Sequence, residues 1–200
     1  VVCWGAGTMG QLGSTFAAYS RVPVPVVGLT DVAAISGGYG HNCALRQTGT
    51  VVCWGWNDYG QLGNGTTSSS YTPVSVHGLA NVTSISAGPT HTCAVLQDKS
   101  VRCWGTDMYG ELGDGAQTTY RTTPAVAFGV SGVEQVIAGY FHTCVLLTDK
   151  GVRCWGNNTA GMLGTGSSAP YSLSPVTPYQ LTGVKRLTAN FTSDCAVLES

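Results

Sequence analysis

The chain has 200 residues, a formal net charge of −1 and 10% charged residues, against roughly 25% in an average globular protein. Its nine Lys and Arg residues are scattered, with no basic run longer than two. Because phosphate contacts need clustered basic side chains, we expect no nucleic-acid partner. No stretch of about 18 apolar residues occurs, so we expect no membrane insertion.

Three short markers recur in a fixed order along the chain. Cys-Trp-Gly begins at residues 3, 53, 103 and 154, a Gly-x-Leu-Gly turn follows each time, and a cysteine comes two residues after a histidine in three copies. A period of about fifty residues indicates a repeat architecture, so we treat residues 1–200 as one segment of four repeats. The chain begins inside a repeat, so we expect it to be part of a longer protein, and the lack of a signal peptide leaves its compartment open.

Each repeat reads as short strands separated by glycine and polar turns. Residues 32–36, 43–46 and 51–54 are apolar or β-branched runs of this kind. One proline falls between the glycine turn and the next strand in three of the repeats: Pro73, Pro124 and Pro175. Because proline donates no ladder hydrogen bond, we expect these segments at sheet edges or strand starts. Three to four strands per repeat, with no sustained helical period, predict an all-β propeller.

Two segments, CWGWNDYGQLGNGTT (53–67) and ISAGPTHTCAVLQDKSVRCWG (85–105), resemble the regulator of chromosome condensation repeat family. The resemblance covers essentially the whole chain and implies blades of a seven-bladed propeller. It also implies that the Trp-Gly pairs and the histidines are mainly blade architecture. Members of the family include a nucleotide exchange factor for a small GTPase, ubiquitin-ligase modules and a secreted β-lactamase inhibitor. Four repeats are too few for such a ring, so we expect further repeats or a neighbouring copy to cover the open blade edges.

Six of the eight cysteines form pairs ten residues apart: Cys43 with Cys53, Cys93 with Cys103, and Cys144 with Cys154. Between the first pair, residues 47–49 fit a three-residue hairpin loop with glycine in the left-handed position, which places the two cysteines opposite each other. Opposed residues at a non-hydrogen-bonded position are close enough for a disulfide. Disulfides indicate an oxidising, extracellular or cell-surface location. The alternative is eight reduced cysteines used as small apolar residues.

Cys3 and Cys195 are left over by this pairing. Either they bond each other across a junction, or their partners lie in absent repeats. A zinc site is not expected, because no C-x₂₋₄-C spacing occurs.

Four N-glycosylation sequons agree with secretion: Asn64, Asn81, Asn157 and Asn190. A chain rich in Ser, Thr and Asn produces some sequons by chance. Asn64 and Asn157 lie in glycine-rich turns, where we expect a glycan to be accessible. Asn81 and Asn190 lie close to predicted strands and are the less secure glycosylation candidates.

One histidine recurs per repeat, at His41, His91 and His142, and Ser193 replaces it in the fourth copy. A metal or acid–base centre is one interpretation. The other is that each histidine hydrogen-bonds adjacent backbone within its own blade, and the serine favours this one. Residues 5–10 fit G-x-G-x-x-G, but no helix follows, as a dinucleotide site requires. With no nucleophile–base pair visible from spacing, we expect no enzyme activity, no metal and no cofactor.

Four tryptophans recur with the blade and are expected in its core or between blades: Trp4, Trp54, Trp104 and Trp155. Trp56, Tyr59 and Tyr109 instead lie in the variable segment after Cys-Trp-Gly. They are a candidate face for a protein or glycan partner, or they simply cover the blade.

Together these patterns predict a secreted, glycosylated, non-catalytic binding or structural scaffold, part of a surface or fibrous assembly. Self-association or further repeats are expected to close the ring. A regulator of a small GTPase, such as a nucleotide exchange factor, is one alternative; low charge and paired cysteines oppose it. A secreted enzyme-inhibiting propeller is the other.

Overall fold

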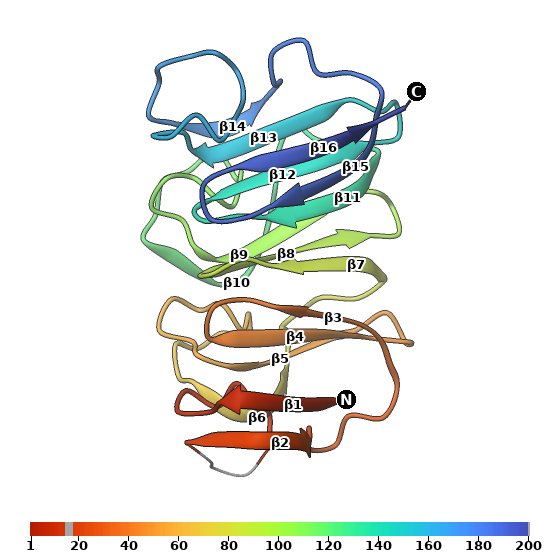
Figure 1. The fold of residues 1–200 in the computed structure, drawn as a ribbon, viewed down its shortest axis with the longest axis vertical. Helices are drawn as coiled ribbons and strands as arrows, with labels where there is room; N and C mark the ends of the chain where they lie inside the picture. Colours follow the sequence, from red (N-terminus) through yellow and green to blue (C-terminus); the bar gives the residue numbers. More distant parts are fainter. Residues whose placement is uncertain (15–17, 200) are drawn as a thin grey trace.

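The computed structural model describes residues 1–14 and 18–199, which form sixteen β-strands stacked blade after blade along the long axis (Figure 1). The first pair is β1 (Val2–Ala6) and β2 (Tyr19–Pro25). The first complete blade has β3 (Val32–Gly37), β4 (His41–Arg46), β5 (Val51–Gly55) and β6 (Ser70–Ser75). The second has β7 (Val82–Ala87), β8 (His91–Leu96), β9 (Val101–Thr106) and β10 (Tyr120–Val126). The third has β11 (Val133–Ala138), β12 (His142–Leu147), β13 (Val152–Asn157) and β14 (Tyr171–Val176), and β15 (Val184–Ala189) and β16 (Asp194–Leu198) end the stack.

Each complete blade is a four-stranded antiparallel sheet whose strands lie in chain order. The first strands, β3, β7, β11 and β15, contact their counterparts in neighbouring blades and so form the inner side of the arc. The fourth strands, β6, β10 and β14, are sheet edges, and they contain Pro73, Pro124 and Pro175. The all-β propeller architecture and the edge position of the prolines are therefore confirmed. The described residues contain no helix long and apolar enough to cross a membrane.

The hairpin between the second and third strands forms as the spacing predicts. Arg46 N–H donates to the Thr50 carbonyl at 2.8 Å, and Gly49 has a φ of 76°. In the next two blades Lys99 and Lys150 adopt the same left-handed conformation, each with a φ of 66°. The loop therefore keeps its geometry without glycine.

Three disulfides bridge these hairpins: Cys43–Cys53, Cys93–Cys103 and Cys144–Cys154. In each pair the two residues are register partners, and their Cα atoms lie 4.1 Å apart. That separation is typical of the non-hydrogen-bonded position that a cross-strand disulfide requires.

The core lies between successive blades and centres on three fully buried tryptophans: Trp54, Trp104 and Trp155. The prediction for Trp4 is wrong, because this side chain is 66% exposed. Trp54 is buried against Val26 and Leu29, in the segment that follows β2, whereas no blade precedes β1 in the described part of the chain. Burial of the indole therefore depends on the previous blade.

The histidines join neighbouring blades. His41 Nε2 lies 2.8 Å from Thr92 Oγ1, and that hydroxyl donates to the Gln61 carbonyl at 3.1 Å. The hydroxyl must therefore accept the imidazole N–H. Equivalent contacts link His91 with Thr143 at 2.9 Å and His142 with Asp194 at 3.0 Å. The expected hydrogen bond to adjacent backbone is wrong for His41 and His91, because their Nδ1 atoms have no hydrogen-bond partner among the described residues. The partner of each Nε2 atom lies one blade further on.

Candidate binding face

Aromatic side chains from several blades gather at one end of the blades. The loops that precede the second strands lie beside the residues that follow Cys-Trp-Gly: Trp56 N–H donates to the Gly40 carbonyl at 2.8 Å, and Asn157 N–H to the Phe141 carbonyl at 2.7 Å. We call the aromatic residues of these two segments the aromatic rim: Tyr39, Trp56, Tyr59, Tyr109, Tyr140, Phe141 and Phe191.

Four of the rim rings form a continuous chain across blades. Tyr109 contacts Phe141 at a centroid distance of 5.5 Å, Phe141 contacts Tyr140 at 4.2 Å, and Tyr140 contacts Phe191 at 5.2 Å. Such pairs contribute about 0.5–1.5 kcal/mol each beyond their buried area. The rings therefore hold one another in place and present a preformed surface.

An open cavity of about 380 Å³ lies next to the rim. It is lined by Tyr39 and Phe191 and by glycines of three successive blades, including Gly88. Tyr39 is 70% exposed and Phe191 54% exposed. Exposed apolar side chains grouped around a hollow are typical of an interaction site.

The rim contains the three aromatic residues that the sequence singled out, but they are among its less exposed members. Trp56, Tyr59 and Tyr109 are each half-buried, and Trp56 packs edge-on against Tyr59 at 5.4 Å. The more exposed members, Tyr39 and Phe191 among them, were missed. The available signal was an aromatic residue two positions before the histidine, or its replacement, in three of the four repeats.

Phe141 has a φ of 62°, in the left-handed region that aromatic residues rarely occupy. Such strained positions cost on the order of 1–3 kcal/mol and cluster at functional sites. Contacts with Tyr109 and Tyr140 hold the Phe141 ring in this position. The strain therefore falls at the centre of the aromatic chain.

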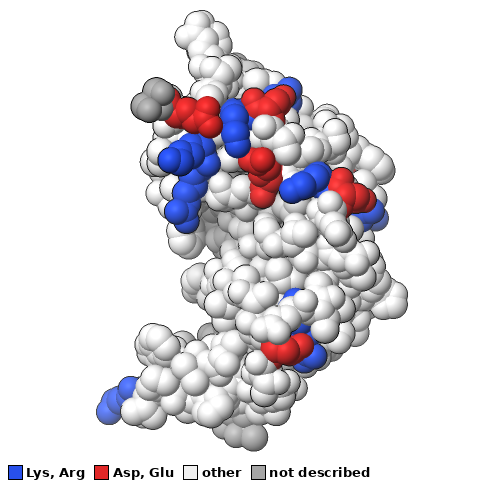
Figure 2. Space-filling model, turned by 90° about the vertical axis from the view of Figure 1, so that its right-hand side faces the viewer, with Lys and Arg blue, Asp and Glu red and all other residues white. Residues whose placement is uncertain are grey.

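Figure 2 shows charged side chains gathered toward the C-terminal end of one face, while much of the rest of that face is uncharged. Positive and negative groups are mixed there. Lys150 pairs with Glu134 at 3.0 Å. Mixed signs give this face no extended field of one sign.

Three of the buried ionisable groups at the blade junctions have strongly shifted pKa values. Burial raises the pKa of Glu111 to about 7 and lowers the pKa of His41 to about 4. Burial lowers the pKa of His91 to about 3, with smaller contributions from His142 and His41. Both histidines are therefore neutral at pH 7, and their hydrogen bonds hold the blades together.

His142, Cys144 and Asp194 place one possible metal-ligand atom each within 4.8 Å of one another. Cys144 is bonded to Cys154, however, so its sulfur is not a thiolate. That leaves one imidazole and one carboxylate, fewer than the three or four protein ligands of a zinc site. This group does not fit zinc while the disulfide is formed.

The four sequons differ in accessibility. Asn81 and Asn190 are exposed, and Asn64 is half-buried. Asn157 is the buried last residue of β13, and its Oδ1 accepts the Thr159 hydroxyl at 2.8 Å. The prediction of an accessible turn at Asn157 is therefore wrong, because the residue ends a strand beneath the following loop. Glycosylation itself stays a prediction.

Cys3 and Cys195 are both free. Cys3 lies on β1 and Cys195 on β16, at the two ends of the arc (Figure 1). The first alternative from the sequence, a bond between these two residues of one chain, is therefore not formed.

Two models of the regulator of chromosome condensation (RCC1) repeat match the sequence. One covers residues 1–45 and 48–95, and the other covers residues 32–61, 82–111 and 133–161. Together they account for well over half of the chain. No curated protein sequence matches it.

Several solved structures share the fold. Prp20p from Saccharomyces cerevisiae has a TM-score of 0.84 at 22% identity, over 100% of this chain and 52% of that chain. The CRINKLY WD40 ectodomain of the Arabidopsis thaliana receptor kinase ACR4 has a TM-score of 0.58 at 20% identity, over 88% of this chain and 54% of that one. The ectodomain of the Physcomitrella patens receptor kinase CR4 has a TM-score of 0.59 at 24% identity, over 90% of this chain and 42% of that chain.

The chain thus spans about half the length of these structures, and at such identities the likeness shows the fold alone. The repeat markers, the blade topology and the matches agree: the chain belongs to the regulator of chromosome condensation (RCC1) repeat family and forms a partial β-propeller.

Proposed function

We propose that this partial propeller is an extracellular, non-catalytic scaffold that binds a protein or glycan partner through its aromatic rim. One observation carries the proposal: the same hairpin is bridged by a disulfide in three successive blades. Such bonds persist in oxidising compartments and are rare in the cytosol and nucleus. The likeness to two receptor-kinase ectodomains supports the same location.

The rim supports binding as the role. Its rings are held by one another and by the backbone, so little conformational freedom is lost when a partner docks. Aromatic residues with a polar edge are also the residues on which binding energy concentrates. The ionisable groups with strongly shifted pKa values, His41, His91 and Glu111, are instead buried at blade junctions, which supports a non-catalytic role.

The location is tested by peptide mass spectrometry of protein taken from its native source, with and without reduction. We expect Cys43–Cys53 and its two counterparts as linked peptides before reduction. Free thiols at all three hairpins in the native protein would contradict the extracellular proposal.

The rim is tested by measuring binding to a glycan array and to proteins of the extracellular medium. Tyr39→Ala with Phe191→Ala is compared with Tyr120→Ala, which removes an exposed ring from β10, outside the rim. We expect the double variant to lose binding and the control to keep it. Equal binding by both variants would place the contact elsewhere.

Regulation of a small GTPase is a second candidate. It is favoured by the likeness to Prp20p, whose structure is described with its binding to Gsp1p and histones. The disulfides and the low charge argue against it. Accelerated nucleotide release from a small GTPase in the presence of the chain would favour the GTPase regulator over the extracellular scaffold.

A further inference from the structure

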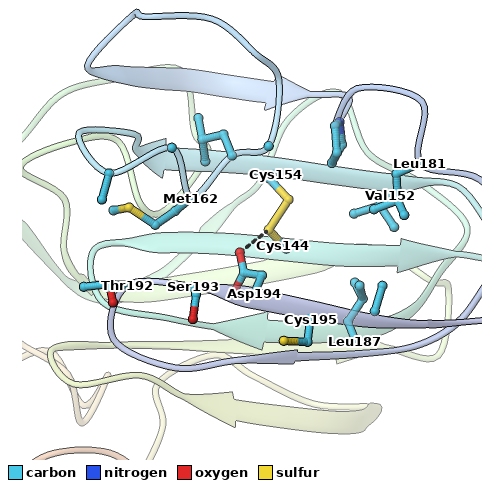
Figure 3. A pocket seen from close by; sticks show the side chains of 16 residues that line it. Cys144, Val152, Cys154, Met162, Leu181, Leu187, Thr192, Ser193, Asp194 and Cys195 are labelled. Carbon is cyan, nitrogen blue, oxygen red and sulfur yellow. Dashed lines mark hydrogen bonds between the residues drawn. A yellow bond between two sulfur atoms is a disulfide. The ribbon is translucent and has the colours of Figure 1, made fainter.

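At the junction between the third blade and the strand pair β15–β16, a carboxylate replaces a hydroxyl. Asp194 occupies the position that Thr92 and Thr143 hold at the two preceding junctions, facing the histidine of the blade before. Both threonine hydroxyls also donate to backbone carbonyl groups, whereas an ionised carboxylate has no proton to donate. Asp194 instead places a charged oxygen beside the Cys144–Cys154 disulfide (Figure 3).

Three of the four ligands that a zinc ion requires already lie close to the corners of a tetrahedron. His142 Nε2 lies 3.0 Å from Asp194 Oδ2, and that oxygen lies 3.6 Å from Cys144 Sγ. Tetrahedral zinc, with bonds of about 2.1 Å to nitrogen and oxygen and about 2.3 Å to sulfur, needs separations of about 3.4 Å and about 3.6 Å between these atoms. The imidazole, the carboxylate and the first sulfur therefore need only small shifts to share one zinc ion.

The fourth ligand is the other half of the disulfide. A thiolate binds zinc, whereas a sulfur atom in a disulfide does not. Reduction by a low-molecular-weight dithiol breaks the S–S bond and gives two cysteine thiols, and the dithiol becomes a disulfide. Cys144 and Cys154 are register partners with Cα atoms 4.1 Å apart. Rotation about their Cα–Cβ bonds then allows the sulfur separation of about 3.8 Å that tetrahedral zinc requires.

His142 is oriented for metal binding in a way that the other two repeat histidines are not. Its Nδ1 atom lies 3.4 Å from the Tyr140 carbonyl oxygen, whereas the Nδ1 atoms of His41 and His91 have no hydrogen-bond partner among the described residues. A proton on Nδ1 of His142 is therefore donated to that carbonyl, which leaves the lone pair of Nε2 for a metal. A metal-bound histidine usually donates its other ring N–H in this way.

We propose that the thiol form of the chain binds one Zn²⁺ ion with His142, Cys144, Cys154 and Asp194, and that the Cys144–Cys154 disulfide expels it. On binding, each thiol loses its proton to solvent, and the neutral imidazole and the carboxylate complete a four-coordinate site. Zinc then joins the third blade to β16, whereas the disulfide bridges a single hairpin.

Oxidation by glutathione disulfide forms the S–S bond between the two cysteines and reduces the oxidant to two glutathione thiols. Only one imidazole and one carboxylate remain, so the zinc ion leaves. The zinc site does not depend on the extracellular role proposed above: a secreted chain binds zinc before oxidation, and a chain that stays reduced keeps it.

The site is tested on reduced protein that lacks the two thiols outside the hairpins. Cys3→Ser with Cys195→Ser removes them. This protein is fully reduced, separated from the reductant under argon and mixed with one equivalent of Zn²⁺. The alkylation rate of each remaining cysteine is then measured by peptide mass spectrometry, with and without zinc.

The Cys93–Cys103 hairpin is the control within the same molecule, because it faces the Thr143 hydroxyl and not a carboxylate. We expect zinc to slow the alkylation of Cys144 and Cys154 by at least about tenfold, since bound thiolates are poor nucleophiles, and to leave the rates at Cys93 and Cys103 unchanged. Equal protection of the two hairpins, or protection of neither, would overturn the proposal.

Asp194→Thr tests the carboxylate, because it gives this junction the residue of the other two. We expect the zinc affinity, measured by competition with a chromophoric chelator, to fall by at least about tenfold. Glu134→Gln removes an exposed carboxylate from β11 and is expected to keep the affinity. Unfolding curves of the two reduced, zinc-free variants check that both remain folded. An unchanged affinity in Asp194→Thr would refute the ligand set.

Expulsion is tested by adding glutathione disulfide to the zinc-loaded protein. We expect one zinc ion to be released, as measured with the same chelator, for each Cys144–Cys154 bond that forms. Zinc that stays bound after this disulfide is complete would contradict the expulsion. Free thiols in the native protein would refute the extracellular location but leave the zinc result unchanged, so the two proposals fail separately.

Discussion

At Glu111 a carboxyl group occupies the position that Gln11 and Gln61 hold in the preceding repeats. All three side chains accept a backbone N–H two residues before them, in this case from Tyr109 at 2.8 Å. The other carboxyl oxygen of Glu111 is buried, with no hydrogen-bond partner in the described part of the chain. A glutamine therefore keeps the hydrogen bond that the Glu111 side chain accepts from Tyr109 and removes the buried charge.

Glu111→Gln is expected to stabilise the protein at high pH. Because burial raises the folded-state pKa to about 7 from 4.5, the stability that Glu111 contributes is fully present below pH 4.5 and is lost as pH rises through 7. We expect a gain in unfolding free energy on the order of 2 kcal/mol at pH 8 and little change at pH 4. Urea denaturation at the two pH values measures this. Glu134→Gln, at an exposed position, is the control, and an equal gain at both pH values would contradict the mechanism.

Thr143→Val tests the hydrogen bonds between blades. The substitution preserves shape but removes the hydroxyl that lies 2.9 Å from His91 Nε2 and that donates to the Glu111 carbonyl at 2.8 Å. A buried imidazole N–H is left without an acceptor, which costs about 1–3 kcal/mol. Chemical denaturation measures the loss against Thr188→Val, at an exposed position on β15. If both variants lose the same amount of unfolding free energy, the hydrogen bond between His91 and Thr143 makes no net contribution to stability.

At the scale of the hairpin, each disulfide joins residues ten apart in the sequence. Replacing Cys93 and Cys103 with serine is expected to lower the unfolding free energy by about 2–3 kcal/mol, because a short loop is no longer closed in the unfolded chain. Denaturation of this double variant under non-reducing conditions measures the effect. Cys3→Ser with Cys195→Ser removes two free thiols and serves as the matched control in the monomer. No difference between the two double variants would contradict the prediction.

The same scale shows how far the sequence predicts the structure. The hairpin from Cys43 to Cys53 and the proline edge strands follow from spacing, because the contacts that define them lie within one repeat. The bond from His41 to Thr92 joins residues 51 positions apart, and the rim joins rings from different blades. Both depend on how far and at what angle one blade packs on the next, which the repeat length does not specify. Trp4 was misplaced because burial of the indole needs a preceding blade, and none precedes β1 in the described part of the chain.

For the molecule as a whole, the interfaces between blades set the response to acid. His41 and His91 are fully buried and neutral, with folded-state pKa values of about 4 and 3 against 6.5 for free histidine. The unfolded chain therefore binds more protons below pH 6.5, and stability falls as pH decreases. The unfolding free energy is expected to fall by about 2 kcal/mol per histidine by pH 5. Glu111 has the opposite effect: because its folded-state pKa is raised, its contribution to the unfolding free energy increases as the pH decreases over the same interval.

The opposing terms give a specific expectation for the pH profile. Between pH 7 and pH 5, wild type is expected to lose less stability than Glu111→Gln, because the variant lacks the group that gains stability on acidification. Adding His91→Gln to that variant keeps an amide donor near Thr143 and removes one of the two acid-sensitive groups, so it should halve the remaining loss. Denaturation curves at half-unit pH steps measure these slopes. Parallel profiles for the three proteins would mean that protons are taken up elsewhere and that the blade interfaces are not the acid-sensitive part of the fold.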